Sequence, residues 1–327
     1  MRQLAHRFVL TENCNATCKH CFNAEVRDGA VMDADLFIDF VRKNSEHLGD
    51  RRALLMGGEP TMHPRIIDII LESTKHYRVA DLFTNGTRLN TIAKHPEIVR
   101  EHFKEKIIYT INGYVFDPVK YLEWKEFTKA ISLHFVITTW GHKETVEKIL
   151  RCCDDYGPEV KIVISGDTTV DVFDDKMLNE YRKIWMDSIK KIVPSLLAVP
   201  MNWQTDHSFP QCFFTQEMLE ELNIIGLPNF QHTVSSCTCP HVGLIGANWD
   251  LHYCNQTRIK LGSVLDENGD PKSMTQLVNQ YVTPAHKIKT ESIKKLRKEC
   301  KDCNALYVCR VGCYYNTLVK HCSSKGG

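Results

Sequence analysis

The chain has 327 residues, enough for about two domains, and its 43% hydrophobic and 25% charged residues are typical of a folded globular protein. The formal net charge is +1, and there are no long runs of like charge. This excludes a protein that binds nucleic acid through a large excess of basic residues. No apolar stretch approaches the roughly 18 residues of a membrane span, and the polar start of the chain does not resemble a signal peptide. We therefore expect a cytoplasmic protein that binds neither nucleic acid nor membrane.

Short apolar runs alternate with helical patterns through residues 1–195. The predicted strands are His6–Thr11, Ala53–Met56, Val79–Thr84, Ile107–Ile111, His134–Thr139 and Val160–Ile164. The predicted helices are Asp33–Ser45, Ile66–Tyr77, Ile92–Phe103, Val119–Ile131, Lys143–Tyr156 and Asp175–Ile192. Such alternation indicates parallel β–α units, and six units are too few for a closed eight-stranded barrel. We predict an α/β fold, a partial (β/α)6 TIM-like barrel, although a doubly wound sheet has the same periodicity.

The sequence changes character after residue 195. Prolines punctuate residues 196–234, which we predict to be a bridging segment with one short helix over Gln216–Leu222. Residues 235–327 are rich in cysteine and poor in apolar periodicity. Because such a segment cannot bury enough apolar area by itself, we expect a small cysteine-rich domain that is held together by metal.

The chain contains 14 cysteines, which in a reducing cytoplasm indicate metal binding more often than disulfides. Cys14, Cys18 and Cys21 follow the first predicted strand, with three and then two residues between them. Three thiolates on one short loop can hold three irons of a 4Fe–4S cluster and leave the fourth iron open. A zinc site, which prefers four protein ligands, and three buried free thiols are the alternatives.

Two further motifs end the next strands: the sequence MGGEP at residues 56–60 and the sequence TNG at residues 84–86. With the cysteine spacing before them, they resemble the radical S-adenosylmethionine superfamily, whose GGE motif meets the amino group of the cofactor. The resemblance covers about residues 6–195 and implies the six-unit partial barrel. It also implies that cofactor contacts come from these turns and from later strand ends, namely Gly57, Gly58, Glu59, Pro60, Thr84, Asn85, Gly86, Asn112, Thr138 and Ser165.

The resemblance also implies a chemistry. In that family the cofactor binds the open iron, and an electron from the cluster cleaves it to a 5′-deoxyadenosyl radical, which takes a hydrogen atom from the substrate. The implied cofactors are S-adenosylmethionine and a 4Fe–4S cluster. The implied partners include a reductant such as flavodoxin or ferredoxin.

A second cysteine block closes the chain, with the spacing C-x2-C-x5-C-x3-C from residue 300. It resembles the SPASM domain, an extension of many peptide-modifying radical enzymes that carries two auxiliary 4Fe–4S clusters and so raises the expected total to three. The resemblance implies an outer cluster on Cys300, Cys303, Cys309 and Cys322, and an inner cluster on Cys239, Cys254, Cys313 and, as the candidate fourth ligand, Cys237. Zinc knots, disulfides and a shortened, single-cluster twitch domain are the alternatives.

One position departs from the family: Trp249 stands where a glycine is usual, five residues before Cys254. We expect the turn to form through Ala247 and Asn248. Of the remaining cysteines, Cys152 and Cys153 lie within a predicted helix and read as core residues.

The expected activity is that of an oxidoreductase or maturase which dehydrogenates or cross-links a peptide or protein side chain. The alternatives are radical dehydrogenation of a small molecule such as a sugar alcohol, and redox-neutral peptide epimerisation with Cys212 as the hydrogen donor. A non-catalytic electron-transfer protein would not need the open-iron motif. We expect substrate contacts from Thr138, Trp140, Ser165 and Asp167, of which Asp167 is also a candidate catalytic residue.

Overall fold

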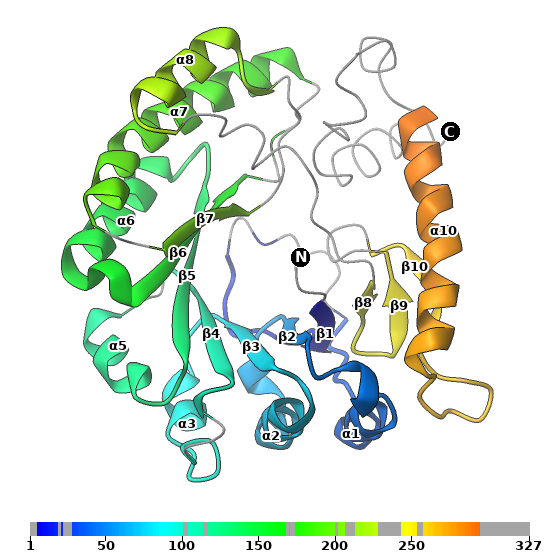
Figure 1. Ribbon diagram of the computed structural model, residues 1–327. Helices are drawn as coiled ribbons and strands as arrows, with labels where there is room; N and C mark the ends of the chain where they lie inside the picture. Colours follow the sequence, from blue (N-terminus) through cyan, green and yellow to red (C-terminus); the bar gives the residue numbers. More distant parts are fainter. Residues whose placement is uncertain are drawn as a thin grey trace. The chain divides into compact units, whose positions relative to one another are not determined.

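The computed structural model describes residues 5–18, 21, 28–100, 104–113, 117–167, 170, 174–199, 202–206, 213–227, 243–253 and 258–294 (Figure 1). The chain divides into two compact units. Unit 1 comprises Met1–Ser132 and Cys239–His286, and unit 2 comprises Leu133–Thr238 and Lys287–Gly327.

Unit 1 contains a mixed sheet with the strand order β10-β9-β8-β1-β2-β3-β4. Its strands are β1 (Ala5–Thr11), β2 (Arg52–Gly57), β3 (Val79–Thr84), β4 (Ile107–Asn112), β8 (Leu244–Ile245), β9 (Asp250–His252) and β10 (Lys260–Ser263). Strands β1 to β4 pair in parallel, β8 joins β1 in parallel, and β8, β9 and β10 form antiparallel pairs. The helices that begin in this unit are α1 (Ala34–Lys43), α2 (Ile66–His76), α3 (Leu89–Ala93), α5 (Pro118–Lys125) and α10 (Met274–Lys294).

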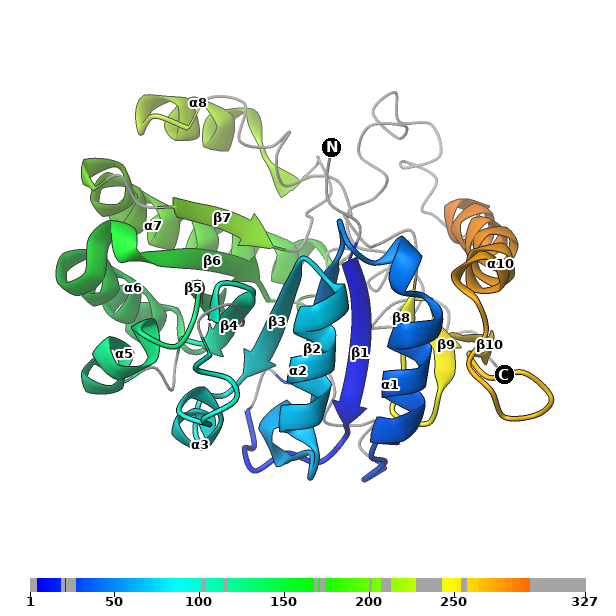
Figure 2. The ribbon, with the colours of Figure 1, turned by 60° about the horizontal axis from the view of Figure 1, so that its bottom comes forward.

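One face of β1, β2 and β3 is covered by α1 and α2, which lie side by side in Figure 2. Successive side chains of a strand point to opposite faces, so the buried Phe8 of β1 meets this helical layer. Its ring lies edge-on to Phe37 and Phe40 of α1, with centroid separations of 5.0 and 5.7 Å. These aromatic contacts fix β1, and hence the segment that follows it, against α1.

The opposite face of the same strands is partly polar. Arg52 of β2 pairs with the buried Asp81 of β3, and the Thr110 hydroxyl of β4 donates to Asp81 Oδ1 at 2.7 Å. Asn112, two residues beyond Thr110, shares that face because side chains alternate along a strand. Asn112 therefore lies on this partly polar face, at the end of β4.

Residues 243–286 extend the sheet of unit 1 with the hairpin of β9 and β10. Trp249, in the turn before β9, has φ of 63°, and its ring lies 6.2 Å from that of Phe40. The turn is closed by Gly246 N donating to Asp250 O at 2.8 Å and Trp249 N donating to Gly246 O at 3.0 Å. The turn expected from the sequence thus forms, with a tryptophan in the left-handed conformation that favours glycine.

Unit 2 contains most of β5 (Ala130–Ile137), followed by α6 (His142–Tyr156), β6 (Val160–Gly166), α7 (Asp175–Ala198), β7 (Asn202–Asp206) and α8 (Gln216–Ile224). Strands β6 and β7 pair in parallel. Tyr181 of α7 is fully buried, and its hydroxyl donates to Ile137 O at 2.8 Å and accepts from Asp167 N at 2.7 Å. A helix side chain therefore joins the ends of β5 and β6.

The predicted parallel α/β architecture is confirmed, and most predicted elements lie within a few residues of their observed bounds. Three expectations were wrong in detail. The helix expected at 92–103 is α3, which ends at Ala93 because Pro96 disfavours helical backbone at the residue before it. Residues 130 and 131, expected at the end of a helix, begin β5. After residue 195 only one short helix was predicted, whereas the described residues there also contain β7 to β10 and the long α10.

None of the helices within the described ranges is long and apolar enough to cross a membrane.

Candidate functional site

The first three cysteines follow β1 in unit 1. Cys14, Cys18 and Cys21 are half-exposed. Ala16 N lies 3.4 Å from Cys14 Sγ, Cys21 N donates to Cys18 O at 3.1 Å, and Asn112 Nδ2 lies 4.0 Å from Cys18 Sγ. In the part of the chain that is described, no three His, Cys, Asp or Glu side chains converge closely enough to hold a metal ion. The loop therefore presents three thiols on one segment without drawing them together.

We call residues 12–30, which carry the three cysteines, the cysteine loop. The two ends of this loop pair with each other. Met32 N donates to Leu10 O and Glu12 N donates to Ala30 O, both at 2.8 Å. Thr11 Oγ1 accepts from Asn13 N at 3.1 Å and thus turns the chain at the end of β1. The pairing fixes where the loop leaves and rejoins the sheet.

Gly57 and Gly58 allow a neighbouring backbone to approach β2 very closely. Gly58 N donates to Thr11 O, and Glu59 N donates to Asn13 O, both at 2.8 Å. A Cβ on Gly57 would lie 2.2 Å from Thr11 O, and a Cβ on Gly58 would lie 2.3 Å from Asn13 O. Gly57 also has φ of 149°. Only glycine fits at both positions, so this pair holds the first residues of the cysteine loop against the end of β2.

The Glu59 carboxylate joins the ends of β2 and β3. Glu59 is completely buried. Its Oε1 accepts from Thr61 N, Thr61 Oγ1 and Thr84 Oγ1 at 3.1, 2.6 and 2.7 Å, and its Oε2 accepts from Asn85 N at 2.6 Å. A buried carboxylate is tolerated when hydrogen bonds satisfy it in this way. Pro60 begins the 3₁₀ turn Pro60–Met62 directly after it.

Asn15, inside the cysteine loop, bonds to the loop after β3. Asn85 Nδ2 donates to Asn15 Oδ1, and Asn15 Nδ2 donates to Thr87 Oγ1, both at 2.8 Å. Thr87 Oγ1 in turn donates to Asn85 Oδ1 at 2.7 Å. Gly86, between them, has φ of 78° and permits this turn. These bonds and those of Glu59 link the cysteine loop to β2 and β3, and we call them the cross-strand network.

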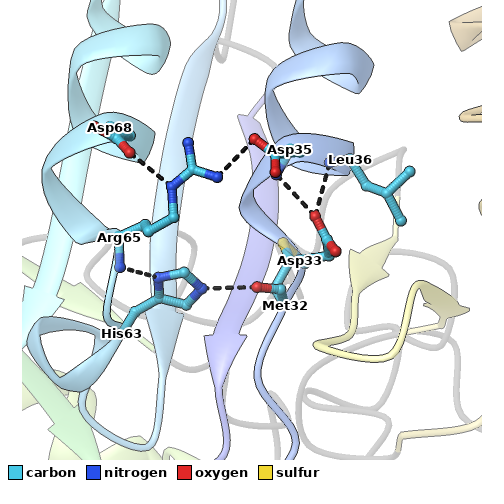
Figure 3. Close-up of polar contacts among 7 residues, drawn as sticks. All are labelled: Met32, Asp33, Asp35, Leu36, His63, Arg65 and Asp68. Atoms are coloured by element: carbon cyan, nitrogen blue, oxygen red, sulfur yellow. Dashed lines mark hydrogen bonds and ion pairs between the residues drawn. The ribbon is translucent and has the colours of Figure 1, made fainter.

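His63 holds the returning end of the cysteine loop (Figure 3). Its Nε2 lies 2.7 Å from Met32 O, and its Nδ1 accepts from Arg65 N at 3.1 Å. Because Nδ1 accepts, Nε2 carries the proton and the ring is neutral. Burial lowers the pKa of His63, in keeping with this state. Arg65 bonds onward to Asp35 of α1 at 2.6 Å, so the starts of α1 and α2 are tied together.

Two predicted residues of unit 2 bond within their own turn or to the adjacent strand. Thr138 Oγ1 accepts from Gly141 N at 3.0 Å, and Ser165 Oγ contacts Nε2 of His134. Thr138 and Ser165 are fully buried, Asp167 is 5% exposed, and Trp140 is 55% exposed. Unit 2 thus brings Ser165 to a histidine that the sequence analysis did not single out.

Nine predicted site residues lie outside the described residues: Cys212, Cys237, Cys239, Cys254, Cys300, Cys303, Cys309, Cys313 and Cys322. Their roles stay predictions. Cys152 and Cys153 are buried in α6, and burial raises the pKa of both thiols, to about 12 and about 11. These are the properties of inert core cysteines.

Asn15, Thr87 and His63 were not predicted from the sequence as site residues. Asn15 lies between two predicted ligands, which is the only signal that could have marked it. Thr87 and His63 each follow a motif by a few residues, but nothing in their spacing indicates their partners.

The residue types of unit 1 match the cluster and cofactor implied by the sequence. Three accessible thiols on one loop are the donor set of a cluster with an open iron. The segment beside them runs from Gly57 to Glu59. Its backbone contacts are so close that no residue with a Cβ atom fits at Gly57 or Gly58.

Known proteins resemble this chain in sequence and in fold. Residues 8–195 match the model of the Radical SAM superfamily. A probable GTP 3′,8-cyclase of Pyrococcus abyssi is 33% identical over 88 residues, which are 27% of this chain and 29% of that protein. The tungsten-containing aldehyde ferredoxin oxidoreductase cofactor-modifying protein of Pyrococcus furiosus is 35% identical over 83 residues, or 24% of this chain and 23% of that protein. The chain therefore matches less than a third of the length of these curated relatives.

Solved structures resemble a larger part of the chain. anSMEcpe with bound AdoMet and Cp18Cys peptide has a TM-score of 0.61 at 16% identity, covering 95% of this chain and 89% of that chain. SuiB of Streptococcus suis bound to S-adenosylmethionine has a TM-score of 0.60 at 16% identity, covering 97% of this chain and 74% of that chain. At such identities the likeness shows a shared fold.

Proposed function

Because the chain belongs to the Radical SAM superfamily, we propose that it binds a 4Fe–4S cluster on Cys14, Cys18 and Cys21 and reductively cleaves S-adenosylmethionine beside it. The observation that carries this proposal is the cross-strand network, which joins the cysteine loop to the two strand ends where cofactor contacts are expected. When bound, cluster and cofactor supply the hydrogen-atom abstraction that starts the reaction.

The chain itself supplies position. We assign the cofactor to the strand ends of unit 1, formed by Gly57, Gly58, Glu59, Pro60, Thr84, Asn85, Gly86 and Asn112. Glu59 is already saturated by protein donors, so its role is to hold the two strand ends at a fixed spacing. Thr138 and Ser165 stay candidates for the same cofactor.

For the substrate we propose a peptide or protein side chain, which the enzyme dehydrogenates or cross-links. The likeness over most of the chain to anSMEcpe and SuiB, which bind the Cp18Cys peptide and the precursor peptide SuiA, supports this class. A small molecule, specifically a nucleotide, is the second candidate, because the local sequence relatives include GTP 3′,8-cyclases. The SPASM-type extension with two auxiliary clusters also belongs to the proposal.

Iron content and cofactor cleavage test the first part. We expect about twelve irons per chain after anaerobic reconstitution, from three clusters of four. Cys18→Ala, reduced with dithionite, should produce no 5′-deoxyadenosine, whereas Cys152→Ala, which removes a core thiol of α6, should keep the activity. Normal production by Cys18→Ala would refute the cluster assignment. About eight irons would favour the single-cluster extension, and about four would refute both auxiliary clusters.

Isotope transfer tests the substrate class. The enzyme is incubated with S-adenosylmethionine and either a fully deuterated peptide digest or a deuterated nucleotide pool. We expect deuterium in the 5′-deoxyadenosine only with the peptides. Transfer only from the nucleotides would replace the peptide proposal by its alternative.

Product mass then separates oxidation from epimerisation. Oxidation removes two hydrogens from the peptide, whereas epimerisation in deuterated water adds one mass unit. Full product from Cys212→Ala would remove the donor role from Cys212.

A further inference from the structure

A largely buried ion pair connects the end of β1 to the hairpin of β9 and β10. Arg258 Nη1 lies 3.0 Å from Glu12 Oε1, and the two side chains are 13% and 6% exposed. Glu12 stands two residues before Cys14, and its backbone N–H donates to Ala30 O in the pairing that closes the cysteine loop. Both residues belong to unit 1. A full charge is thus held immediately before the first predicted ligand and is matched by a charge from a distant part of the sequence.

Arg258 has an unusual backbone conformation. Its φ of 48° is left-handed, which is uncommon for a residue with a side chain. Its carbonyl accepts from His252 Nδ1 at 3.0 Å, and Tyr253 N donates to Ile259 O at 2.8 Å, so contacts across the hairpin determine it. Such backbone strain persists only where several surrounding contacts fix the conformation. Strained residues of this kind are common at functional sites.

The charge of Glu12 matters because charges interact strongly where water is excluded. A buried carboxylate without a compensating cation creates a negative potential in its surroundings. The reduction potential of an iron–sulfur cluster depends on nearby charge, hydrogen bonds and solvent exposure. A negative potential disfavours addition of an electron, and a compensating cation removes that effect.

We propose that Arg258 is a positioning residue that neutralises Glu12 and thereby keeps the reduction potential of a cluster on Cys14, Cys18 and Cys21 within reach of the physiological reductant. This inference rests on the cluster assignment in the proposed function. It gives residues 243–286 a role in cofactor cleavage that does not depend on auxiliary clusters.

The test uses the full-length reconstituted protein and measures the midpoint potential of that cluster by redox titration followed by electron paramagnetic resonance. The potential of Arg258→Gln should shift to more negative values, and that of Glu12→Gln to more positive values. The double variant and the conservative Arg258→Lys should both lie near the wild type. Opposite shifts that cancel require a charge effect, since simple loss of structure would move both single variants in the same direction.

Lys260→Ala is the matched control, because Lys260 pairs with Asp250 on the same hairpin at 2.7 Å but is 59% exposed. Its potential should equal that of the wild type. Shifts of the same sign in both single variants, or none in either, would overturn the inference. Absence of a cluster signal that depends on Cys14, Cys18 and Cys21 in the wild type would instead refute the proposed function.

Amide hydrogen exchange of the protein without its cluster provides a second test, which also applies to variants that fail to incorporate iron. In the apoprotein, Arg258→Gln should accelerate amide hydrogen exchange of residues 11–18 by about tenfold or more, and the double variant should restore part of that protection. Unchanged exchange in an iron-free Arg258→Gln variant would show that Arg258 does not position this segment, and would overturn its assignment as a positioning residue.

Discussion

In unit 1, polar side chains at the ends of three successive strands bond to one another, whereas in unit 2 Thr138 bonds within its own turn and Ser165 reaches only the adjacent strand. Glu59 after β2 accepts from Thr84 and Asn85 after β3, and Asn85 donates to Asn15 after β1. Thr138 after β5, by contrast, accepts from Gly141 three residues away. Both sets look alike in the sequence: a strand that ends in small and polar residues.

The difference indicates what each set of strand ends does. A network that spans three strands fixes the relative positions of their loops, which is the requirement for holding a cluster and a cofactor together. A local bond fixes one turn. Disrupting the cross-strand network should therefore cost more, and reach further, than disrupting the partners in unit 2.

The largest effect should come from Gly58→Ala. The new Cβ would meet the backbone oxygen of Asn13 at 2.3 Å, so the cysteine loop must move away from β2. We expect the free energy of unfolding to fall by at least about 2 kcal/mol and iron incorporation to fail. Chemical denaturation and iron analysis measure both. Gly49→Ala is the control, since nothing lies within 4 Å of its Cβ position; an equal loss there would contradict this account.

The second-largest effect should come from Glu59→Gln. The amide nitrogen would face donors that now bond to a carboxylate oxygen, and charge-assisted hydrogen bonds would be lost. We expect a loss of about 2–3 kcal/mol, with faster amide exchange at Asn85. Ser165→Ala, at the end of β6, is the comparison in unit 2. Equal exchange at Asn85 in both variants would remove the distinction between the two units.

The stability of unit 1 should depend on pH because of His6. Burial, with a smaller contribution from Arg51, lowers the pKa of His6 to about 3. Its Nε2 faces Arg51 Nη1 and its Nδ1 faces Tyr77, both at 3.0 Å. The unfolded state binds a proton near pH 6.5 and the native state does not, so stability is greatest above that pH and declines as pH falls toward about 3.

From His6 alone, the loss between pH 7 and pH 5 should be about 2 kcal/mol. Burial lowers the pKa of His63 too, so His63 should add to the decline. Denaturation of the wild type and His6→Gln across this range measures the contribution. The slope should flatten in His6→Gln and persist in His47→Gln, whose parent histidine is exposed.

Thr138→Val should have the smallest effect, about 1 kcal/mol, because it removes one acceptor from Gly141 N and preserves shape. Faster exchange should be confined to the start of α6. Spread of the change to Asn85 would show that the two sets of strand ends are coupled. Binding of S-adenosylmethionine to the same variant tests the predicted cofactor contact of Thr138.

Particular residues show which features could be predicted from the sequence. Buried strands such as Val79–Thr84 were located because apolar period and turn residues are local properties. The start of β5 was missed because Ala130 and Ile131 continue a helical pattern that the sheet overrides. The loop of Cys14, Cys18 and Cys21 and the glycines at 57 and 58 were found by spacing and order. Asn15, Thr87 and Arg258 were not, because their partners lie 70 or more residues away and no local pattern encodes such pairs.

The distance along the chain between the cysteine loop and its partners has a consequence for biosynthesis. Asn15 bonds to residues 70 and 72 positions later, and Glu12 bonds to a residue 246 positions later. At a ribosomal rate of about 5–20 residues per second, the thiols leave the ribosome seconds before β3 exists to hold their loop, and longer still before Arg258 arrives. Iron delivered during that interval would meet an unorganised segment. Insertion of the proposed cluster is therefore expected to follow completion of the fold, on a chain that must keep three half-exposed thiols reduced until then.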